Sequence, residues 1–212
     1  MKTTESEQKM SPALTRIHEA AIGLFAEKGS SDITVSELAQ AAGIARGTVY
    51  NNLESTDTLF EEIAARLAAE MLDRIVASFA DIEDPAQRLA RGMRLFIRRA
   101  HEEPSWGRFF NRFALTTASL QAVWTGAPMA DVLTGMTSSR YALSAEQLPG
   151  VMAMIAGTVL TSMLLVLEGH QTWRQAGTDA AELVLRALGL PQDEAREIAN
   201  ADLPPLPELD QP

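Results

Sequence analysis

The sequence predicts an all-α fold in which an N-terminal three-helix head with a helix-turn-helix is joined by a long helix to a C-terminal helical body. Apolar residues recur at three- and four-residue spacing in successive segments of the 212-residue chain, which is the period of an amphipathic helix. Helix start signals precede several of these segments, either a polar cap followed by proline or a capping box. Residues 34–53, in addition, have the pattern of two short helices joined by a tight turn.

The first helix is expected to begin at Ser11-Pro12 and to end at Gly29. Serine can cap the first turn, proline is tolerated at the first helical position, and glycine suits the C-terminal end. Lys28 lies in the last turn, where the helix dipole favours a cation. The predicted apolar stripe consists of Leu14, Ile17, Ala21, Leu24 and Phe25.

The next two helices form the predicted helix-turn-helix. Thr34 and Glu37 have the spacing of a capping box, and Gly43 suits a left-handed conformation in the turn. The second of these helices is expected to run from about Ala45 to Asn52. Helical spacing predicts that four residues of this helix point away from the core: Arg46, Thr48, Tyr50 and Asn51.

These outward-pointing residues are typical of a helix that reads DNA. Arginine can pair with guanine edges, asparagine with adenine, and threonine or tyrosine with phosphate or a thymine methyl group. Gly47 lies inside the same helix, where glycine costs about 1 kcal/mol relative to alanine. A close approach of the backbone to DNA would account for it. The alternative interpretation is a solvated surface helix that contains an accidental glycine.

The charge balance predicts little electrostatic attraction to DNA. The net charge is −10, whereas nucleic-acid binders are usually basic. Residues 38–53 contain a single charged residue, Arg46. We therefore expect modest non-specific affinity and a dependence on dimerisation.

The head resembles a known family. The segment TRIHEAAIGLFAEKGSSDITVSELAQAAGIARGTVYNNLESTDTLF is similar to the N-terminal DNA-binding domain of TetR-family transcriptional regulators, over roughly residues 12–65. The resemblance implies an all-helical homodimer with a ligand-binding C-terminal body. It also implies that the DNA-facing residues are Thr34, Ser36, Arg46, Thr48, Tyr50 and Asn51, with Lys28 near phosphate.

The sequence departs from the family pattern after the reading helix. The family usually has an aromatic pair or a histidine there, then phenylalanine and a Ser-Lys-Glu-type start of the fourth helix. Here the residues are Asn52, Leu53 and Ser55-Thr56-Asp57. The missing lysine leaves one phosphate contact without its usual residue.

A long helix is expected from Asp57 to about Ala80, connecting the head to the body, and another from Asp84-Pro85. The second of these carries four arginines on one face. They could form an anion-binding wall, although a solvated stripe paired with nearby acids is the more common arrangement. The four are Arg88, Arg91, Arg94 and Arg98.

Aromatic and methionine side chains between residues 106 and 136 are candidates for the lining of a ligand cavity, because such pockets are mostly apolar. Each of them, taken singly, is more often ordinary core, and methionine also fills gaps. The candidate ligand-binding residues are Trp106, Phe109, Phe110, Phe113, Trp124, Met129 and Met136.

Residues 147–167 contain no charged residue, and this stretch is long enough for a membrane span. Several Pro, Gly, Thr and Ser residues and the lack of a Lys/Arg-rich flank favour burial instead. Ser144 with Gln147 is the expected cap, and Thr178 or Asp179 is expected to cap the next helix. By family likeness the two helices form the dimer interface, with contacts from Met152, Ile155, Val159, Met163, Leu183 and Ala187.

The expected organisation is a disordered N-terminus (1–10), a DNA-binding domain (11–55), a ligand-binding and dimerisation body (56–200) and an extended, proline-rich surface tail (201–212). The chain has no cysteine and three dispersed histidines, and it shows no metal-binding or catalytic motif. We therefore expect no metal, cofactor or enzymatic activity.

The sequence favours a cytoplasmic, homodimeric regulator that binds a near-palindromic operator in double-stranded DNA. A repressor released by a small, largely apolar effector is the expected form. The alternatives are a ligand-binding or scaffolding dimer that has lost DNA binding, an enzyme with a dispersed site, and attachment to a membrane through residues 147–167.

Overall fold

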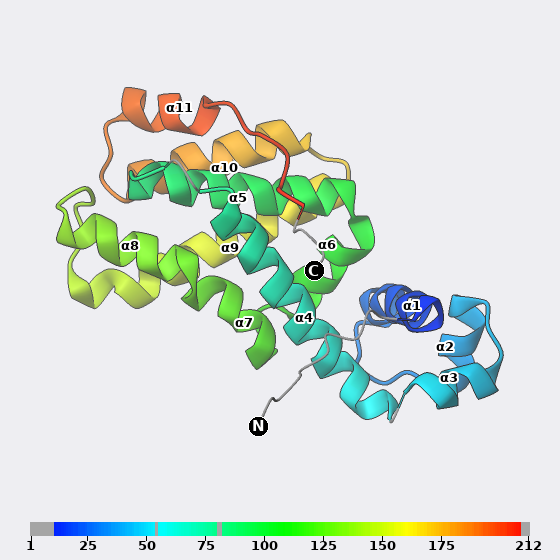
Figure 1. Cartoon of the computed structure of the whole chain (residues 1–212). Coiled ribbons are helices and arrows are strands. Elements are labelled where there is room, and N and C mark those ends of the chain that lie inside the picture. Colours follow the sequence, from blue (N-terminus) through cyan, green and yellow to red (C-terminus); the bar gives the residue numbers. More distant parts are fainter. Residues whose placement is uncertain (1–10, 54, 80–81, 209–212) are drawn as a thin grey trace. The chain divides into compact units, whose positions relative to one another are not determined.

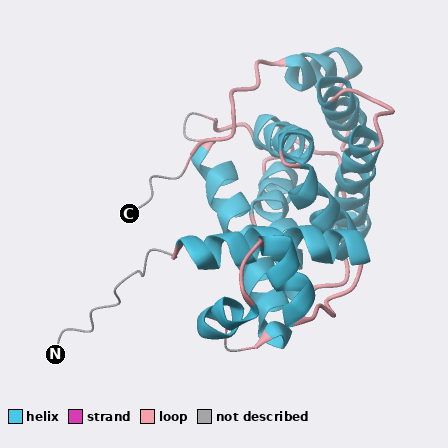
Figure 2. Ribbon diagram, turned by 90° about the vertical axis from the view of Figure 1, so that its right-hand side faces the viewer, coloured by secondary structure: helices cyan, strands magenta, loops and turns pink. Residues whose placement is uncertain are grey.

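The computed structural model describes residues 11–53, 55–79 and 82–208. Within these ranges every regular element is helical (Figure 2), which confirms the expected all-α fold. The expected disorder of residues 1–10 lies outside the described residues. The helices are α1 (Pro12–Lys28), α2 (Val35–Ala42), α3 (Arg46–Asn52), α4 (Thr56–Ala77), α5 (Pro85–Glu102), α6 (Pro104–Phe113), α7 (Ala118–Thr125), α8 (Ala127–Thr137), the 3₁₀ helix η1 (Ala145–Gln147), α9 (Leu148–Leu167), α10 (Trp173–Ala187) and α11 (Gln192–Asn200).

The chain divides into two compact units, residues 1–63 and residues 64–212. The division falls inside α4, so this single helix belongs to both units. The sequence-based boundary, between residues 55 and 56, lies instead at the start of α4.

The first unit is built around the helix-turn-helix formed by α2 and α3, which pack on α1. Its core contains Ile17, Phe25, Leu38 and Val49, all without solvent exposure. The ring of Phe60, at the start of α4, meets Phe25 edge-on at 5.1 Å. Each such side chain stabilises the fold by about 1.5–3 kcal/mol through its burial, so apolar packing fixes the position of α3 within this unit.

The second unit is organised around α5. This helix packs against α6, α8, α9, α10 and α11, and Figure 1 shows it running beside α10. It begins as the sequence predicts, because the Asp84 side chain accepts a hydrogen bond from Ala86 N at 3.0 Å and Pro85 follows.

The two long helices after α8 begin at different kinds of cap. The predicted capping box of Ser144 and Gln147 is present before α9. The predicted cap of α10 is wrong: Thr172, not Thr178 or Asp179, accepts the capping hydrogen bond from Gln175 N, at 3.2 Å. The helical apolar spacing continues upstream through Ala176, so the cap lies six residues before Thr178.

The described part of the C-terminal segment, residues 201–208, is extended, as predicted, but it packs in part against the body. Arg94 donates to the carbonyl oxygen of Ala201 at 2.7 Å, and Arg74 donates to that of Pro207 at 2.8 Å. Leu206, between them, is 7% exposed. This part of the segment is therefore anchored to the second unit by two arginines and one buried leucine, whereas the sequence predicted a surface tail.

One described helical stretch, Ala145–Leu167, is apolar and long enough to cross a membrane by length and composition, with a mean hydropathy of 2.1. Half of it is buried within the single chain. The core helix of a soluble protein has the same properties, so this stretch is weak evidence for a membrane span.

Candidate DNA-binding and ligand-binding sites

The start of α2 is fixed by the predicted capping box. The Thr34 hydroxyl accepts a hydrogen bond from Glu37 N at 3.2 Å, and Thr34 N donates to Glu37 Oε2 at 2.8 Å. Lys28 completes this junction through an ion pair with Glu37 at 3.0 Å. The backbone hydrogen bond from Thr34 and the nearby Lys28 ammonium lower the pKa of Glu37 to about 2.

These bonds give Lys28 and Thr34 a structural role in the first unit. Both side chains are engaged inside the junction between α1 and α2, and Lys28 also donates to the carbonyl oxygen of Asp32 at 2.8 Å. A phosphate contact by Lys28 would compete with these bonds. The two residues therefore position the helix-turn-helix within the first unit.

The turn between α2 and α3 depends on Gly43, whose backbone is left-handed at φ 62° and ψ 41°. This conformation favours glycine because a side chain would be strained there. Arg16 of α1 donates to the carbonyl oxygen of Ala42 at 2.8 Å and so ties α1 to the end of α2. Sequence reasoning did not find Arg16, because a single exposed cation on a helix gives no signal about a distant carbonyl group.

The outer face of α3 is open to solvent. Tyr50 is 68% exposed, although tyrosine is usually half-buried or more. A side chain at Gly47 would have no atom within 4 Å, so packing inside the first unit does not require glycine there. Of the predicted DNA-contacting residues on α2 and α3, all are exposed except Thr48, which is half-buried: Ser36, Arg46, Gly47, Thr48, Tyr50 and Asn51.

Asn52 has a structural role at the end of α3. Its amide donates to the carbonyl oxygen of Thr48 at 2.8 Å, and its carbonyl oxygen accepts from the Ser11 hydroxyl at 3.1 Å. The residue thereby joins α3 to the start of α1.

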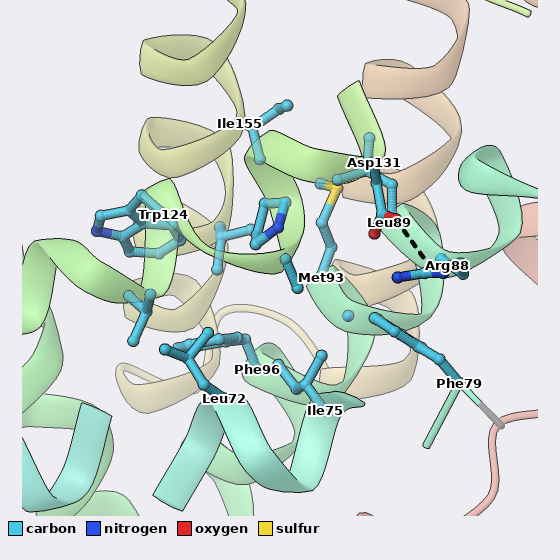
Figure 3. Close-up of a pocket in the computed structure, with 15 residues that line it drawn as sticks. Leu72, Ile75, Phe79, Arg88, Leu89, Met93, Phe96, Trp124, Asp131 and Ile155 are labelled. Carbon is cyan, nitrogen blue, oxygen red and sulfur yellow. Dashed lines mark ion pairs between the residues drawn. The ribbon is translucent and has the colours of Figure 1, made fainter. Parts of the chain in front are cut away.

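An apolar pocket lies within the second unit (Figure 3). Its free volume is about 20 Å³, which is room for about one water molecule. Side chains from α4, α5, α7, α8 and α9 contribute to the wall. They are Leu72, Ile75, Phe79, Arg88, Leu89, Gly92, Met93, Phe96, Val123, Trp124, Ala127, Pro128, Asp131, Ile155 and Val159.

One end of this pocket is polar. Asp131 and Arg88 lie together there, and Trp124 lies at the opposite end (Figure 3). Arg88 Nε is 2.9 Å from Asp131 Oδ1, but the contact lacks hydrogen-bond geometry, since this nitrogen has no hydrogen-bond partner among the described residues. Asp131 is 3% exposed. Burial raises the pKa of Asp131 to about 6, against the opposing influence of Arg88.

Most of the predicted ligand-binding residues lie elsewhere. Only Trp124 lines this pocket; the other six do not. Four of the six form a continuous aromatic cluster in the core, in which the Trp106 and Phe110 ring centroids are 4.3 Å apart. These four are Trp106, Phe109, Phe110 and Phe113, and all are buried. Met129 and Met136 are half-buried outside the pocket lining.

The four arginines of α5 do not form an anion-binding wall. Arg88 faces Asp131, whereas Arg91 donates to the carbonyl oxygen of Ser78 at 2.8 Å. Arg94 binds the carbonyl oxygen of Ala201, and Arg98 pairs with Glu102 at 2.8 Å. Arg88, Arg91 and Arg94 therefore hold three different segments against α5, whereas Arg98 pairs with a residue of α5 itself.

The residues expected at the dimer surface differ in their burial. Four of the predicted contact residues on α9 are buried in the core of their own chain, which leaves little of their surface for a partner: Met152, Ile155, Val159 and Met163. The outer face of α9 instead carries Ala153, Gly157, Thr161 and Leu164, and the outer face of α10 carries Leu183 and Ala187. Leu183 is 59% and Leu164 45% exposed.

No group of three or more His, Cys, Asp or Glu side chains that could hold a metal ion occurs among the described residues.

Family models match both parts of the chain. The model of bacterial regulatory proteins of the TetR family matches residues 17–63. A tetracycline repressor-like C-terminal domain matches residues 84–201, which is more than half of the chain. The chain belongs to the TetR family. Its N-terminal helix-turn-helix lies within the matched head domain, as the resemblance implied.

Relatives support the same assignment for this TetR-family regulator. It is 34% identical over 87 residues to AlkX, an HTH-type transcriptional regulator of Mycobacterium tuberculosis, with 41% of each chain covered. It is 29% identical over 105 residues to an uncharacterised HTH-type regulator of the same organism, with 50% of this chain and 52% of the relative covered. The chain thus spans about half the length, or less, of these curated relatives.

Solved structures share the fold. RolR in complex with resorcinol is similar with a TM-score of 0.68 and 24% identity, over 91% of this chain and 95% of RolR. The fatty acid degradation regulator FadR from Bacillus halodurans has a TM-score of 0.70 and 18% identity, over 87% of this chain and all of FadR (100%). At these identities the likeness shows the fold alone.

Proposed function

We propose that this TetR-family regulator is a cytoplasmic, homodimeric repressor that a small, largely apolar molecule releases from a near-palindromic operator. The observation that carries the proposal is that α4 lines the pocket and also belongs to both units. Leu72 and Ile75 of this helix line the pocket of the second unit, and the same helix starts in the first unit. A ligand that displaces these two side chains acts directly on the element shared by both units.

DNA recognition is assigned to the exposed face of α3. Arg46, Tyr50 and Asn51 supply a guanidinium, a phenol and an amide, which are groups that contact bases and phosphates. The open space around Gly47 supports a close approach of the α3 backbone to DNA. Because the net charge is −10, these contacts must provide a larger share of the affinity than general attraction to phosphate does.

Dimerisation is assigned to the outer faces of α9 and α10. Leu164 and Leu183 are exposed on two helices that pack against each other. Small residues on α9, namely Ala153, Gly157 and Thr161, allow another helix to approach closely. A two-fold dimer would bring two α3 helices to the two halves of a palindrome, as dimeric helix-turn-helix proteins require.

The proposed effector acts by linkage. It must bind the DNA-incompetent conformation more tightly than the DNA-bound one, and DNA must then weaken effector binding by the same factor. RolR was crystallised with resorcinol, a small aromatic molecule, which supports a ligand of similar size in the pocket of this chain.

A selection of bound sequences from random double-stranded DNA tests the proposal. We expect enrichment of a near-palindromic site by the parent protein. Replacing Arg46 or Tyr50 by alanine should weaken binding to that site by about 10-fold to 100-fold. Arg174→Ala, which removes an exposed arginine from α10, is the matched control and should leave binding unchanged.

The same selection also distinguishes the rival function. If the parent protein enriches no sequence, the chain is better described as a ligand-binding or scaffolding dimer without DNA binding.

A further inference from the structure

The polar end of the pocket is under-satisfied. An ionised carboxylate can accept about four hydrogen bonds, and Asp131 accepts none from the described residues; its one polar contact is the ion pair with Arg88 at 2.9 Å. The Nε–H of Arg88 is buried and has no hydrogen-bond partner in the described part of the chain. A buried charged group left in this condition costs stability. Both groups therefore retain hydrogen-bonding capacity at the pocket wall.

The rest of the wall defines the shape of the occupant. Phe96 and Trp124 stack with centroids 5.6 Å apart at an interplanar angle of 28°. Leu72, Ile75 and Met93 also line the pocket (Figure 3). These are apolar side chains, and the thioether of Met93 adapts its shape readily. Such a wall suits a small, compact apolar body.

The two opposite charges restrict the polar group that such a ligand can carry. A carboxylate would be attracted by Arg88 but repelled by Asp131, and an ammonium group would meet the reverse arrangement. A wholly apolar ligand would leave both charges without a further partner. A neutral hydroxyl group can donate a hydrogen bond to Asp131 and accept one from Arg88, so it satisfies both.

We propose that the effector of this regulator is a single-ring or similarly small apolar molecule with a neutral hydroxyl group, which Asp131 and Arg88 recognise together. This inference rests on the proposed function, in which the pocket of the second unit takes the effector. Asp131 and Arg88 are then the residues that determine ligand specificity, and Phe96 and Trp124 hold the ring.

Entry of such a ligand requires the pocket to expand. The free volume is about 20 Å³, whereas cavities that hold a benzene ring are on the order of 150 Å³. Of the lining residues, Leu72 and Ile75 belong to α4. Expansion of the pocket on this side moves α4, the helix that both units share. The size of the ligand is thereby coupled to the regulatory response.

The test compares four probes of similar size by calorimetry at pH 7.5: phenol, toluene, benzoate and benzylamine. Each is titrated into the full chain and into the double variant Arg88→Met/Asp131→Leu. Replacing a buried ion pair by apolar residues of similar volume is often neutral or stabilising, so we expect this variant to fold. The measured quantity is the ratio of phenol affinity to toluene affinity. Comparing this ratio between the two proteins removes the contribution of the different hydrophobicities of the two probes.

We expect this ratio to be about tenfold or more higher in the parent than in the double variant, because hydrogen bonds to charged groups are lost. An unchanged ratio, stronger binding of benzoate or benzylamine than of phenol, or no binding of any probe at 10 mM would each overturn the inference.

Gly92→Ala provides a second variant that does not depend on the ion pair. A Cβ at this position would meet Phe79 at 3.6 Å and Ile75 at 3.8 Å, which are ordinary contact distances, so the variant fills the pocket without strain. It should weaken phenol and toluene alike and leave their ratio unchanged. A loss confined to phenol would contradict our assignment of the ring to this pocket.

DNA binding by the unliganded parent, measured in parallel on the selected sequence, separates the two proposals. If DNA binding is absent but the ratio changes as expected, the proposed regulatory function fails and hydroxyl recognition stands. If DNA binding is present but the ratio is unchanged, hydroxyl recognition alone fails.

Discussion

Replacing Asp131 by asparagine should change how the stability of the second unit depends on pH. Asp131 is 3% exposed, and asparagine has nearly the same shape without an ionisable group. The substitution therefore removes one titration while it leaves the packing of α8 in place.

The size of the effect follows from the two pKa values of Asp131. Burial raises the pKa from 3.8 to about 6 in the folded chain. Between these values the folded state binds more protons than the unfolded state, so the free energy of unfolding decreases as the pH rises. From pH 5.5 to pH 7.5 the wild type should lose about 0.8 kcal/mol through this group. The Asp131→Asn variant cannot lose it.

Urea unfolding at the two pH values, followed by tryptophan fluorescence, measures this difference. Trp106, Trp124 and Trp173 all belong to the second unit, so the signal reports on the unit that contains Asp131. Both pH values lie above the sequence pI of 4.8, where the net negative charge limits aggregation. The stability of the variant relative to the wild type should rise by about 0.8 kcal/mol between pH 5.5 and pH 7.5.

Asp73→Asn, at an exposed position of α4, is the matched control and should show no such rise. A constant difference between the Asp131→Asn variant and the wild type would refute the reasoning. A difference of opposite sign would mean that attraction to Arg88 outweighs burial.

Three further substitutions test other parts of the structure. Thr34→Ala removes the cap of α2 and should reduce the stability of the first unit by about 1 kcal/mol, measured by circular dichroism during urea unfolding. Gly135→Ala places a Cβ where it overlaps the Tyr141 ring and should destabilise the second unit by about 1–3 kcal/mol, whereas Gly92→Ala in the same assay should not. Leu183→Glu puts a charge on the exposed face of α10 and should convert the proposed dimer to a monomer in analytical ultracentrifugation; a dimer of unchanged affinity would exclude this face.

The helix-turn-helix was largely predictable because its signals are local. The Thr34 box and the left-handed glycines at residues 29 and 43 act within a few residues of the chain. The exposed face of α3 followed from helical spacing alone. Arg16 and Asn52 could not be found in this way, since their partners lie 26 and 41 residues away.

The lining of the apolar pocket and the buried face of α9 could not be predicted from the sequence, for a physical reason. The apolar residues of α9 are spread around the helix, so composition does not show which side faces the core. Packing against α5, α6 and α10 buries Ile155 and Val159 and leaves Leu164 exposed. Likewise, Phe110 and Trp124 are both buried aromatic residues, and only the arrangement of five helices decides which of them lines the pocket.

The sequence by itself determined the family, the helical fold and the exposed face of α3, because these depend on period and on caps a few residues apart. Only the tertiary structure decided the partners of Asp131, the separate roles of the four α5 arginines and the packing of Leu206. Those outcomes depend on contacts between residues far apart in the chain, where burial and charge are set by neighbours that a linear pattern does not identify.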